Sequence, residues 1–394
     1  MAQTQAPGAD PVAVAAELCS LLTHNAAQAE SDRRLPAENV QALEDANLFK
    51  LMVQRRWGGY AASLPTAIRT FAELAKGCGS TGWVAMILNG YGWWASLLSD
   101  RGQEEVFADA HARVCAAGAP SLKGLRVPGG LRISGKFPFA SGCWHSSWGG
   151  LNVQVEDGDH NPVDVVVAFA SVSELEIEDT WFVAGICGTG SNTLMARDVF
   201  VPDHRVLWMA KVLNGELAHR RHTGEHSDHY WMYSANALIT IAPVIGIAQS
   251  ILDCVIDGTG KLGITFTTYV RQADSSVVQH QIAEAAVKID SALLLTLRSA
   301  HEVQDAAVAG TMMDYVARAR IRGVVGFAAR LLREAIDPLM SIGGASDFAD
   351  SSPLQRMWRD ASVATRHVLL ATDPSLETYG RALLGVEGNI TPMI

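Results

Sequence analysis

The spacing of the apolar residues changes twice along the 394-residue chain. Before about residue 110, and again after residue 229, apolar side chains recur every three or four residues, as in amphipathic helices. Between His111 and Arg205 the chain consists of short β-rich runs separated by turn signals, and Val127–Gly130 is predicted to form a hairpin turn. We therefore expect an α+β, multi-domain chain: an N-terminal helical domain (1–110), a central β-barrel-like domain (111–215) and a C-terminal four-helix bundle (216–394).

The C-terminal part contains long, apolar-periodic segments of similar length, which are typical of an antiparallel bundle. The most apolar stretch, Ala237–Ile256, is interrupted by Pro243 and by polar residues, so we interpret it as a buried core helix and not as a membrane span. The predicted bundle helices are Tyr233–Gly258, Ser276–Ala309, Thr311–Ile336 and Pro353–Leu370.

The charge and the cysteines restrict the class of partner. A formal net charge of −10 argues against nucleic acid or an anionic membrane as a partner. The six cysteines form no CxxC pair and have no zinc-finger spacing, which suits free thiols in a reducing compartment. We therefore expect a cytoplasmic protein that acts on a small molecule.

A glycine- and serine-rich turn lies directly before the last predicted bundle helix. Because glycine lets the backbone approach a ligand closely and a helix N-terminus attracts anions, this turn could hold a phosphate, and His367 in the following helix could reach the rest of that molecule. A purely structural Gly-Gly turn is the alternative. The residues of the turn are Gly343, Gly344, Ala345 and Ser346, and Pro353 follows at the expected helix start.

Two further motifs lie in the β-rich region. The segment FPFASGCWHSSW (137–148) ends a predicted strand in a tight turn, where Ser141 and Gly142 could present a hydroxyl and backbone amides to a flat polar ring. A plain hairpin turn with a structural His145 is the alternative. The segment GICGTGSN (185–192) permits a close turn in which Ser191 could contact a ligand. It lacks the strand–turn–helix context and the acidic residue of a dinucleotide site.

The polar segment 219–229 contains histidines at intervals of three, four and three, a spacing that suggests metal ligands on a helix. Gly224 interrupts such a helix, and two adjacent arginines would repel a cation. We therefore favour a polar segment between domains, near the substrate entrance, over a metal site. The histidines are His219, His222, His226 and His229.

The pattern GGxSxxxxxxPxxRxWRD, which begins at Gly343, resembles the final long helix of the acyl-CoA dehydrogenase fold. Dehydrogenases of that family carry a catalytic glutamate about two turns after the pair that is Arg359 and Asp360 here. His367 stands near that place, and without a carboxylate there is no base for the α-proton of a thioester. With the STGW segment (80–83) and FxSGxxHxxW, the chain resembles the two-component flavin-dependent monooxygenases of this fold, the phenol and secosteroid hydroxylases.

This resemblance implies roles for particular residues. His367 would hydrogen-bond the peroxide or a phenolic oxygen, and Ser141 would lie near flavin N5. Arg271 would reach the flavin phosphates of a neighbouring subunit, although a solvated arginine near a helix start is an equal alternative. The implied flavin-binding residues are Trp83, Ser141, Gly142, Ser191, Arg271, Gly343, Gly344, Ala345 and Ser346; the implied substrate-binding residues are Asn89, Trp93 and His145; and Trp83, Trp144 and Trp148 would exclude water.

The resemblance also implies a reaction. A separate NAD(P)H:flavin reductase would supply reduced FMN or FAD, with FMN preferred, and oxygen would add at flavin C4a to hydroxylate a small aromatic substrate in a homotetramer. Asn89, where some phenol hydroxylases have a histidine, and Ala116 and Ala117, where some have serine, favour a polycyclic substrate such as a polyketide or secosteroid. Oxygenation at nitrogen or sulfur, non-catalytic flavin binding and acyl-CoA dehydrogenation stay open as alternatives, the last being disfavoured.

Overall fold

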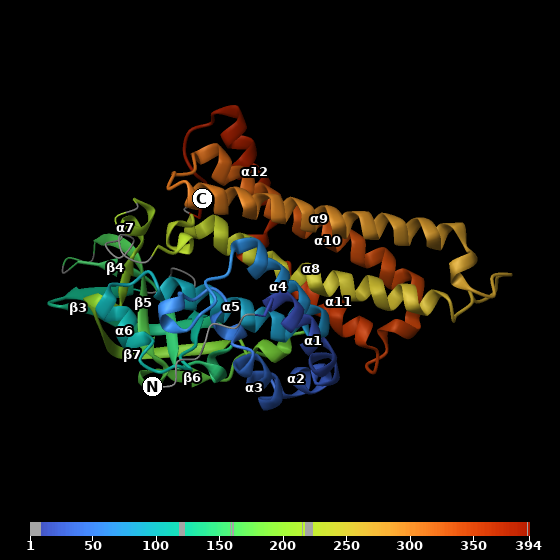
Figure 1. The fold of residues 1–394 in the computed structure, drawn as a ribbon, viewed down its shortest axis with the longest axis horizontal. Coiled ribbons are helices and arrows are strands. Elements are labelled where there is room, and N and C mark those ends of the chain that lie inside the picture. Colours follow the sequence, from blue (N-terminus) through green and yellow to red (C-terminus); the bar gives the residue numbers. More distant parts are fainter. Residues whose placement is uncertain are drawn as a thin grey trace.

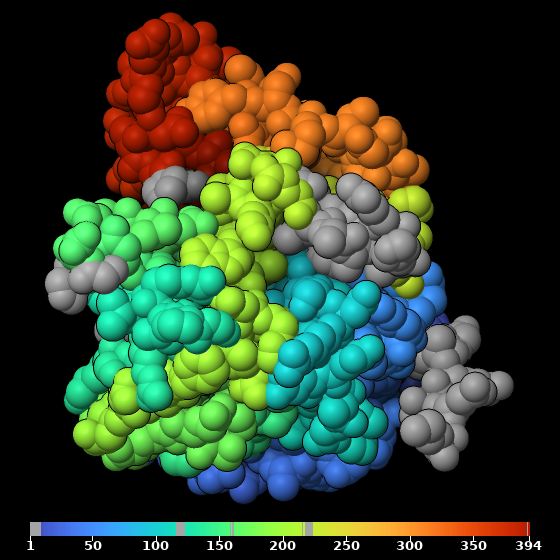
Figure 2. Space-filling view, turned by 90° about the vertical axis from the view of Figure 1, so that its left-hand side faces the viewer, coloured from blue at the N-terminus to red at the C-terminus, as the bar shows by residue number. Residues whose placement is uncertain are grey.

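A computed structural model describes residues 9–117, 123–157, 159, 161–214, 216, 224–391 and 393–394. Helices come first, a sheet follows, and long helices come last, which is the predicted α+β order (Figure 1). The long C-terminal helices lie side by side and extend away from the sheet. Viewed from the sheet end, the last helix projects above the rest of the molecule (Figure 2).

The N-terminal helices place one apolar helix, α5, between the bundle and the sheet. It packs against α8 (Met232–Thr259) of the bundle and against strand β1 (Val114–Ala117), and almost every residue of it is buried. An all-round apolar helix of this kind can only be stable inside the protein. The helices are α1 (Pro11–His24), α2 (Ala26–Asp32), α3 (Ala37–Asp45), α4 (Leu64–Gly77), α5 (Gly79–Ala95) and α6 (Asp100–Val106).

The strands of the described residues form one sheet in the order β6-β7-β3-β2-β4-β5-β8, with β1 paired to β4. The predicted hairpin is confirmed, because Val127 pairs with Gly130 at the β2–β3 turn. The register of β3 on β7 shifts between Phe137 and Ala140, where β3 ends. The strands are β1 (Val114–Ala117), β2 (Lys123–Val127), β3 (Gly130–Ala140), β4 (Trp148–Glu156), β5 (Pro162–Ser171), β6 (Glu176–Glu178), β7 (Asn192–Pro202) and β8 (Val206–Trp208).

The four predicted bundle helices begin and end close to the predicted residues, with two exceptions. Helix α10 begins four residues later than predicted and continues through Pro338 to Gly343. The last predicted bundle helix was expected to reach Leu370, but it ends at Ala364, so the prediction for its C-terminal turns is wrong. The helices are α7 (Met209–Leu213), α8 (Met232–Thr259), α9 (Ser276–Val308), α10 (Tyr315–Gly343), α11 (Pro353–Ala364) and α12 (Thr372–Leu384).

Side chains explain the early end of α11. The hydroxyl of Thr365 donates to the carbonyl of Ala361 at 2.8 Å, and His367 caps the short helical turn Val368–Leu370 through its own ring. Polar side chains that bond locally to the backbone compete with helix continuation. His367 therefore lies in a turn, and the neighbouring Val368 is 55% exposed.

Helix α8 is long and apolar enough to cross a membrane by length and composition, and it is the one such helix among the described residues. Of its most apolar window, 72% is buried inside the protein. It packs against α4, α5 and α10. The prediction of a buried core helix is confirmed.

Two neighbouring residues of α11 attach it to the loop before β7. The Asp360 carboxylate accepts a hydrogen bond from the backbone N–H of Ile186 at 2.5 Å. The Arg359 guanidinium donates to the carbonyl of Ala184 in the same loop and also pairs with Glu30 of α2. Gly185 lies against α11 so closely that a Cβ would be 2.2 Å from the carbonyl oxygen of Arg359. Only glycine allows this approach.

The buried carboxyl of Asp360 makes stability depend on pH. Burial raises its pKa to about 7, and Glu30 adds to this, while Arg356 and Arg359 lower it. A carboxyl whose pKa is higher in the folded than in the unfolded chain lowers stability as pH rises between the two values. Asp360→Asn keeps an acceptor for the N–H of Ile186 and cannot ionise. The melting temperature of the variant minus that of wild type should therefore increase as the pH rises from 5 to 8.

The measurement is thermal unfolding at several pH values, with Asp350→Asn, an exposed carboxyl, as the matched control. The difference between Asp350→Asn and wild type should show much less pH dependence. A constant difference between Asp360→Asn and wild type from pH 5 to 8 would contradict the assignment.

Candidate functional site

Three buried hydroxyls and one indole form a continuous hydrogen-bonded cluster where β3 ends and β7 begins. Trp83 Nε1 of α5 donates to Ser141 Oγ at 3.3 Å, and Ser141 Oγ lies 2.7 Å from Ser191 Oγ. Ser191 Oγ lies 2.7 Å from Thr189 Oγ1, which donates to the carbonyl of Ile186 at 2.8 Å. We call Trp83, Ser141, Ser191 and Thr189 the hydroxyl cluster.

The backbone around the hydroxyl cluster adopts unusual conformations. Phe139 and Ile186 have positive φ angles of 64° and 47°, and Gly142 and Gly190 are also left-handed. The N–H of Gly142 donates to the carbonyl of Thr189 at 2.8 Å and so joins the two loops. Left-handed residues other than glycine cost about 1–3 kcal/mol each and occur mainly at functional sites.

His367 lies beside the hydroxyl cluster. Its ring meets Trp83 edge-on at 5.5 Å between centroids, and its Nδ1 accepts a hydrogen bond from the N–H of Leu369 at 3.3 Å. Burial lowers the pKa of His367 to about 4, so the ring is neutral at pH 7. Because Nδ1 accepts, the ring proton is on Nε2, and His367 offers one N–H donor.

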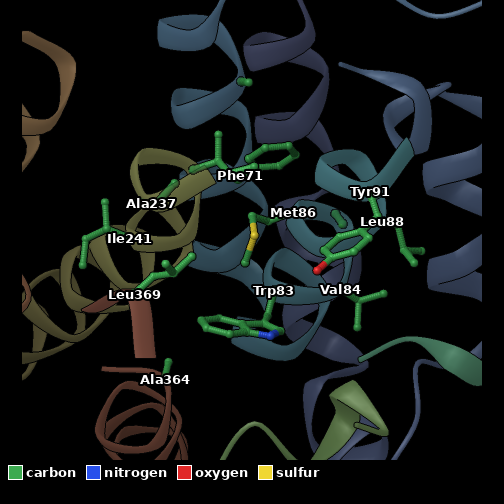
Figure 3. Close-up of a cluster of buried hydrophobic side chains, with 14 of the residues drawn as sticks. Phe71, Trp83, Val84, Met86, Leu88, Tyr91, Ala237, Ile241, Ala364 and Leu369 are labelled. Atoms are coloured by element: carbon green, nitrogen blue, oxygen red, sulfur yellow. The ribbon is translucent and has the colours of Figure 1, made fainter. Parts of the chain in front are cut away.

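Figure 3 shows the buried apolar side chains around Trp83. The benzene ring of Trp83 extends toward Ala364 and Leu369, the residues on either side of the His367 turn, while Val84 and Met86 lie elsewhere around α5. The structure thus brings Trp83, Ser141, Ser191 and His367 together from four separate segments, as the sequence predicted for one site.

The surface next to this cluster is aromatic and open. Phe139 is 65% exposed and Trp144 is 42% exposed, so in the single chain Trp144 does not exclude water as expected. Trp148 is partly buried, with the Arg205 guanidinium 5.0 Å from its ring centroid. An exposed aromatic surface beside buried hydroxyls suits a flat heteroaromatic ligand.

His145 has an unusual buried nitrogen. Among the residues that the structure describes, its Nε2 has no hydrogen-bond partner, and burial, with Arg34 and Arg113 nearby, lowers the pKa of the ring to about 4. A buried polar atom without a partner is uncommon and points to a missing ligand or water. This geometry is compatible with the predicted contact to substrate.

Asn89 and Trp93 were expected to bind substrate, but their polar groups are used within the protein. Asn89 Nδ2 donates to the carbonyls of Leu48 and Ala85 at 2.7 and 2.8 Å, and its Oδ1 accepts from the N–H of Met52. Trp93 Nε1 donates to the carbonyl of Ser227 at 3.0 Å. Both side chains are completely buried, which gives them a packing role and no free donor for a substrate.

The other predicted flavin-binding residues lie apart from the hydroxyl cluster. Arg271 is exposed and pairs with Asp274 at 2.6 Å, and the adjacent Gln272 donates to the carbonyl of Ile342. Arg271 and Gly343–Ser346 therefore adjoin each other, at the end of the bundle away from the sheet (Figure 1). Helix α11, about 18 Å long at 1.5 Å per residue, separates this end from His367.

A separate cleft of about 560 Å³ lies next to β8 and α7, and its other walls are the residues just before α6, Arg126 of β2, and Asp203 and His204. Arg126 pairs with Asp203 there. Within the ranges that the structure covers, no group of three histidine, cysteine or acidic residues could hold a metal ion. His219 and His222 lie outside these ranges.

Sequence reasoning missed Thr189 and the link from Asp360 to Ile186. The only local signal for Thr189 was the run of small hydroxyl residues in GTGS (188–191). Asp360 was noted only as part of a family pattern. Asp360 and Ile186 are 174 residues apart, and Thr189 joins the cluster only because Ser191 contacts Ser141, 50 residues away, so no local pattern identifies either role.

The comparisons with known proteins agree with the geometry. The family models described as "Acyl-CoA dehydrogenase, N-terminal domain" and "Acyl-CoA dehydrogenase, C-terminal domain" match residues 13–116 and 238–372. The oxygenase subunit HsaA of a flavin-dependent monooxygenase from Mycobacterium tuberculosis is 35% identical over 88% of each chain.

Two further relatives cover nearly the whole chain. The oxygenase component of an FADH2-dependent resorcinol hydroxylase from a Rhizobium species is 30% identical over 94% of this chain and 93% of its own. The structure of XiaF from a Streptomyces species, in complex with FADH2 and glycerol, has a TM-score of 0.91 and 31% identity over 98% of this chain and 97% of its own. The predicted fold and enzyme class are confirmed, and the chain belongs to the flavin-dependent monooxygenases of the acyl-CoA dehydrogenase fold.

Proposed function

We propose that this chain is the oxygenase component of a two-component monooxygenase, which uses reduced flavin and O2, through a C4a-hydroperoxyflavin, to hydroxylate a phenolic or polycyclic aromatic substrate. The observation that carries the proposal is the neutral His367 beside the buried hydroxyl cluster. The relatives with printed activities are hydroxylases or monooxygenases, which supports the same reaction class.

His367 is poorly suited to dehydrogenation. Its Nδ1 is occupied by the N–H of Leu369, and its Nε2 carries the proton, so the neutral ring has no free lone pair for a substrate proton. A dehydrogenase needs a base at this step. The same ring is well suited to donate a hydrogen bond to a phenolate oxygen of the substrate.

The hydroxyl cluster suits a flavin ring. Ser141, Ser191 and the turn at Gly142 would lie along its polar edge, and Trp83 would pack beside it. When bound, reduced flavin supplies the oxygen-activating chemistry. The chain's own residues exclude water on the buried side and fix the positions of the hydrogen-bond donors and acceptors.

The cofactor and the partner follow from the same proposal. The name of the resorcinol hydroxylase and the XiaF complex both specify FADH2, which favours FAD over the FMN expected from the sequence. The word "oxygenase component" in a relative's name supports a separate NAD(P)H:flavin reductase as the source of reduced flavin. We place the reaction in the cytoplasm, on a small aromatic substrate.

A homotetramer would complete the flavin site. Arg271 and Gly343–Ser346 lie about one helix length from His367 in the same chain, so we propose that they bind the flavin phosphates of a neighbouring copy. Large apolar side chains are exposed at the same end of the bundle, among them Val270, at 83%, and Phe266. A free surface of this kind is typical of a subunit interface.

An anaerobic titration tests the function. Reduced FAD and reduced FMN are added to the protein, and then oxygen is added with a phenol, a polycyclic phenol, an amine or a thioether. We expect tight binding of reduced flavin, a transient absorbance of a flavin–oxygen adduct, and hydroxylation of the phenols. Products oxygenated only at nitrogen or sulfur would replace the hydroxylase assignment, and failure to bind either reduced flavin would refute the proposed function.

Substitution of His367 tests its part in the reaction. His367→Ala should lower the hydroxylation rate by about 100-fold or more, the usual range for a positioned proton donor or acceptor, while His367→Gln, which has an N–H donor, should retain part of the rate. Val368→Ala, at the exposed neighbouring position, is the control. Because the pKa of His367 is about 4, this residue should cause no break in the pH–rate profile between pH 6 and 8. Full activity of His367→Ala would exclude a role for His367 in the hydroxylation step.

Light scattering after size exclusion tests the assembly. We expect a tetramer for wild type. Val270→Asp, which puts a charge in the proposed interface, should give smaller species and weaker binding of reduced flavin. Val163→Asp, at an exposed position on β5, should remain tetrameric. A wild-type monomer that binds reduced flavin tightly would refute the shared site.

A further inference from the structure

The hydroxyl cluster contains as many donor protons as hydrogen bonds. The four bonds join Trp83 to Ser141, Ser141 to Ser191, Ser191 to Thr189, and Thr189 to the carbonyl of Ile186. The four protons belong to the indole N–H and the three hydroxyls, since each hydroxyl has one proton and a carbonyl has none. All four bonds form only if every proton points the same way along the chain.

The two ends set that direction. The indole of Trp83 can only donate, and the carbonyl of Ile186 can only accept. The hydroxyl of Thr189 therefore donates to the carbonyl of Ile186. Ser191 donates to Thr189, and Ser141 donates to Ser191. Ser141 accepts from Trp83, so its remaining hydrogen-bonding capacity is one lone pair.

The acceptor end is held rigidly. The carbonyl of Ile186 also accepts from the N–H of Thr189 at 3.1 Å and from Trp181 Nε1 at 3.2 Å. The N–H of Ile186 donates to Asp360. These bonds fix the left-handed Ile186 on both sides of its Cα, so its carbonyl cannot turn away from Thr189.

Burial removes the alternatives to this order. Ser141, Thr189 and Ser191 are each at most 5% exposed, so water does not compete for their protons from the protein side. Reversing the chain would remove the Thr189–Ile186 hydrogen bond, and no other bond within the cluster would replace it, so the cluster would make three bonds where it now makes four.

We propose that Thr189, acting through Ser191, makes Ser141 a hydrogen-bond acceptor and so makes the site selective for reduced over oxidised flavin. This inference rests on the proposed function. Reduced flavin carries a proton on N5 and can donate a hydrogen bond to Ser141. N5 of oxidised flavin has only a lone pair, which would face the lone pair of Ser141 without forming a hydrogen bond. Thr189 and Ser191 are positioning residues, and Ser141 is the contact.

The test compares equilibrium binding of the two redox states. Dissociation constants of oxidised and of anaerobically reduced FAD and FMN are measured for wild type, Thr189→Val, Thr189→Ser and Thr193→Val. In Thr189→Val, Ser191 loses its acceptor and can donate to Ser141, which frees the proton of Ser141 for N5. The preference for reduced flavin should fall about tenfold or more.

The control variants separate this effect from general damage. Thr189→Ser keeps the hydroxyl and should keep the wild-type preference. Thr193→Val removes a buried hydroxyl that bonds to Thr180 outside the cluster, and it should also keep the preference. If Thr189→Val does not fold, Ser191→Ala interrupts the same chain of bonds and should produce the same fall.

The outcomes distinguish the two proposals. If wild type binds both redox states and folded Thr189→Val or Ser191→Ala retains the wild-type preference, this inference is wrong and the proposed function stands. If wild type binds neither reduced FAD nor reduced FMN, this inference and the proposed function are both wrong. A reduced preference in Thr189→Val, restored in Thr189→Ser and unchanged in Thr193→Val, supports the inference.

Discussion

The contact between α11 and the loop before β7 determines the geometry of the site. Gly185 has no Cβ and therefore touches the backbone of Arg359, and Asp360 holds the N–H of the next residue, Ile186. This contact joins a bundle helix to a loop of the sheet. Because Ile186 is the end point of the hydroxyl cluster and α11 leads into the His367 turn, the same contact positions both halves of the site.

The site works with neutral groups whose hydrogen-bond directions are fixed. Burial keeps His367 uncharged, and its Nδ1 bond leaves one donor. The hydroxyls of Ser141, Ser191 and Thr189 are ordered by an indole at one end and a carbonyl at the other. In such an environment the ligand is recognised by whether its atoms donate or accept, since an unmatched pair cannot be rescued by solvent.

The separation of Arg271 and Gly343–Ser346 from this cluster has a simple geometric cause. The bundle helices are long, and the connections that carry these residues are at the end remote from the sheet. The polar ring system of a flavin and its phosphates would thus be bound by different regions. Under the proposed assembly, two copies of the chain supply them.

Local sequence pattern by itself determined the order of helices and strands, the β2–β3 hairpin and the buried nature of α8, because each depends on the spacing of apolar residues and on turn residues near one another. The family motifs also predicted one site for Ser141, Ser191, Trp83 and His367, which lie close together in the structure. Only the tertiary structure decided that α11 ends at Ala364 and that Thr189 and Asp360 support the site. It also showed that the side-chain donors of Asn89 and Trp93 form hydrogen bonds within the protein, to the carbonyls of Leu48, Ala85 and Ser227. Most of these assignments depend on hydrogen bonds between residues far apart in the sequence, and a local pattern carries no information about such partners.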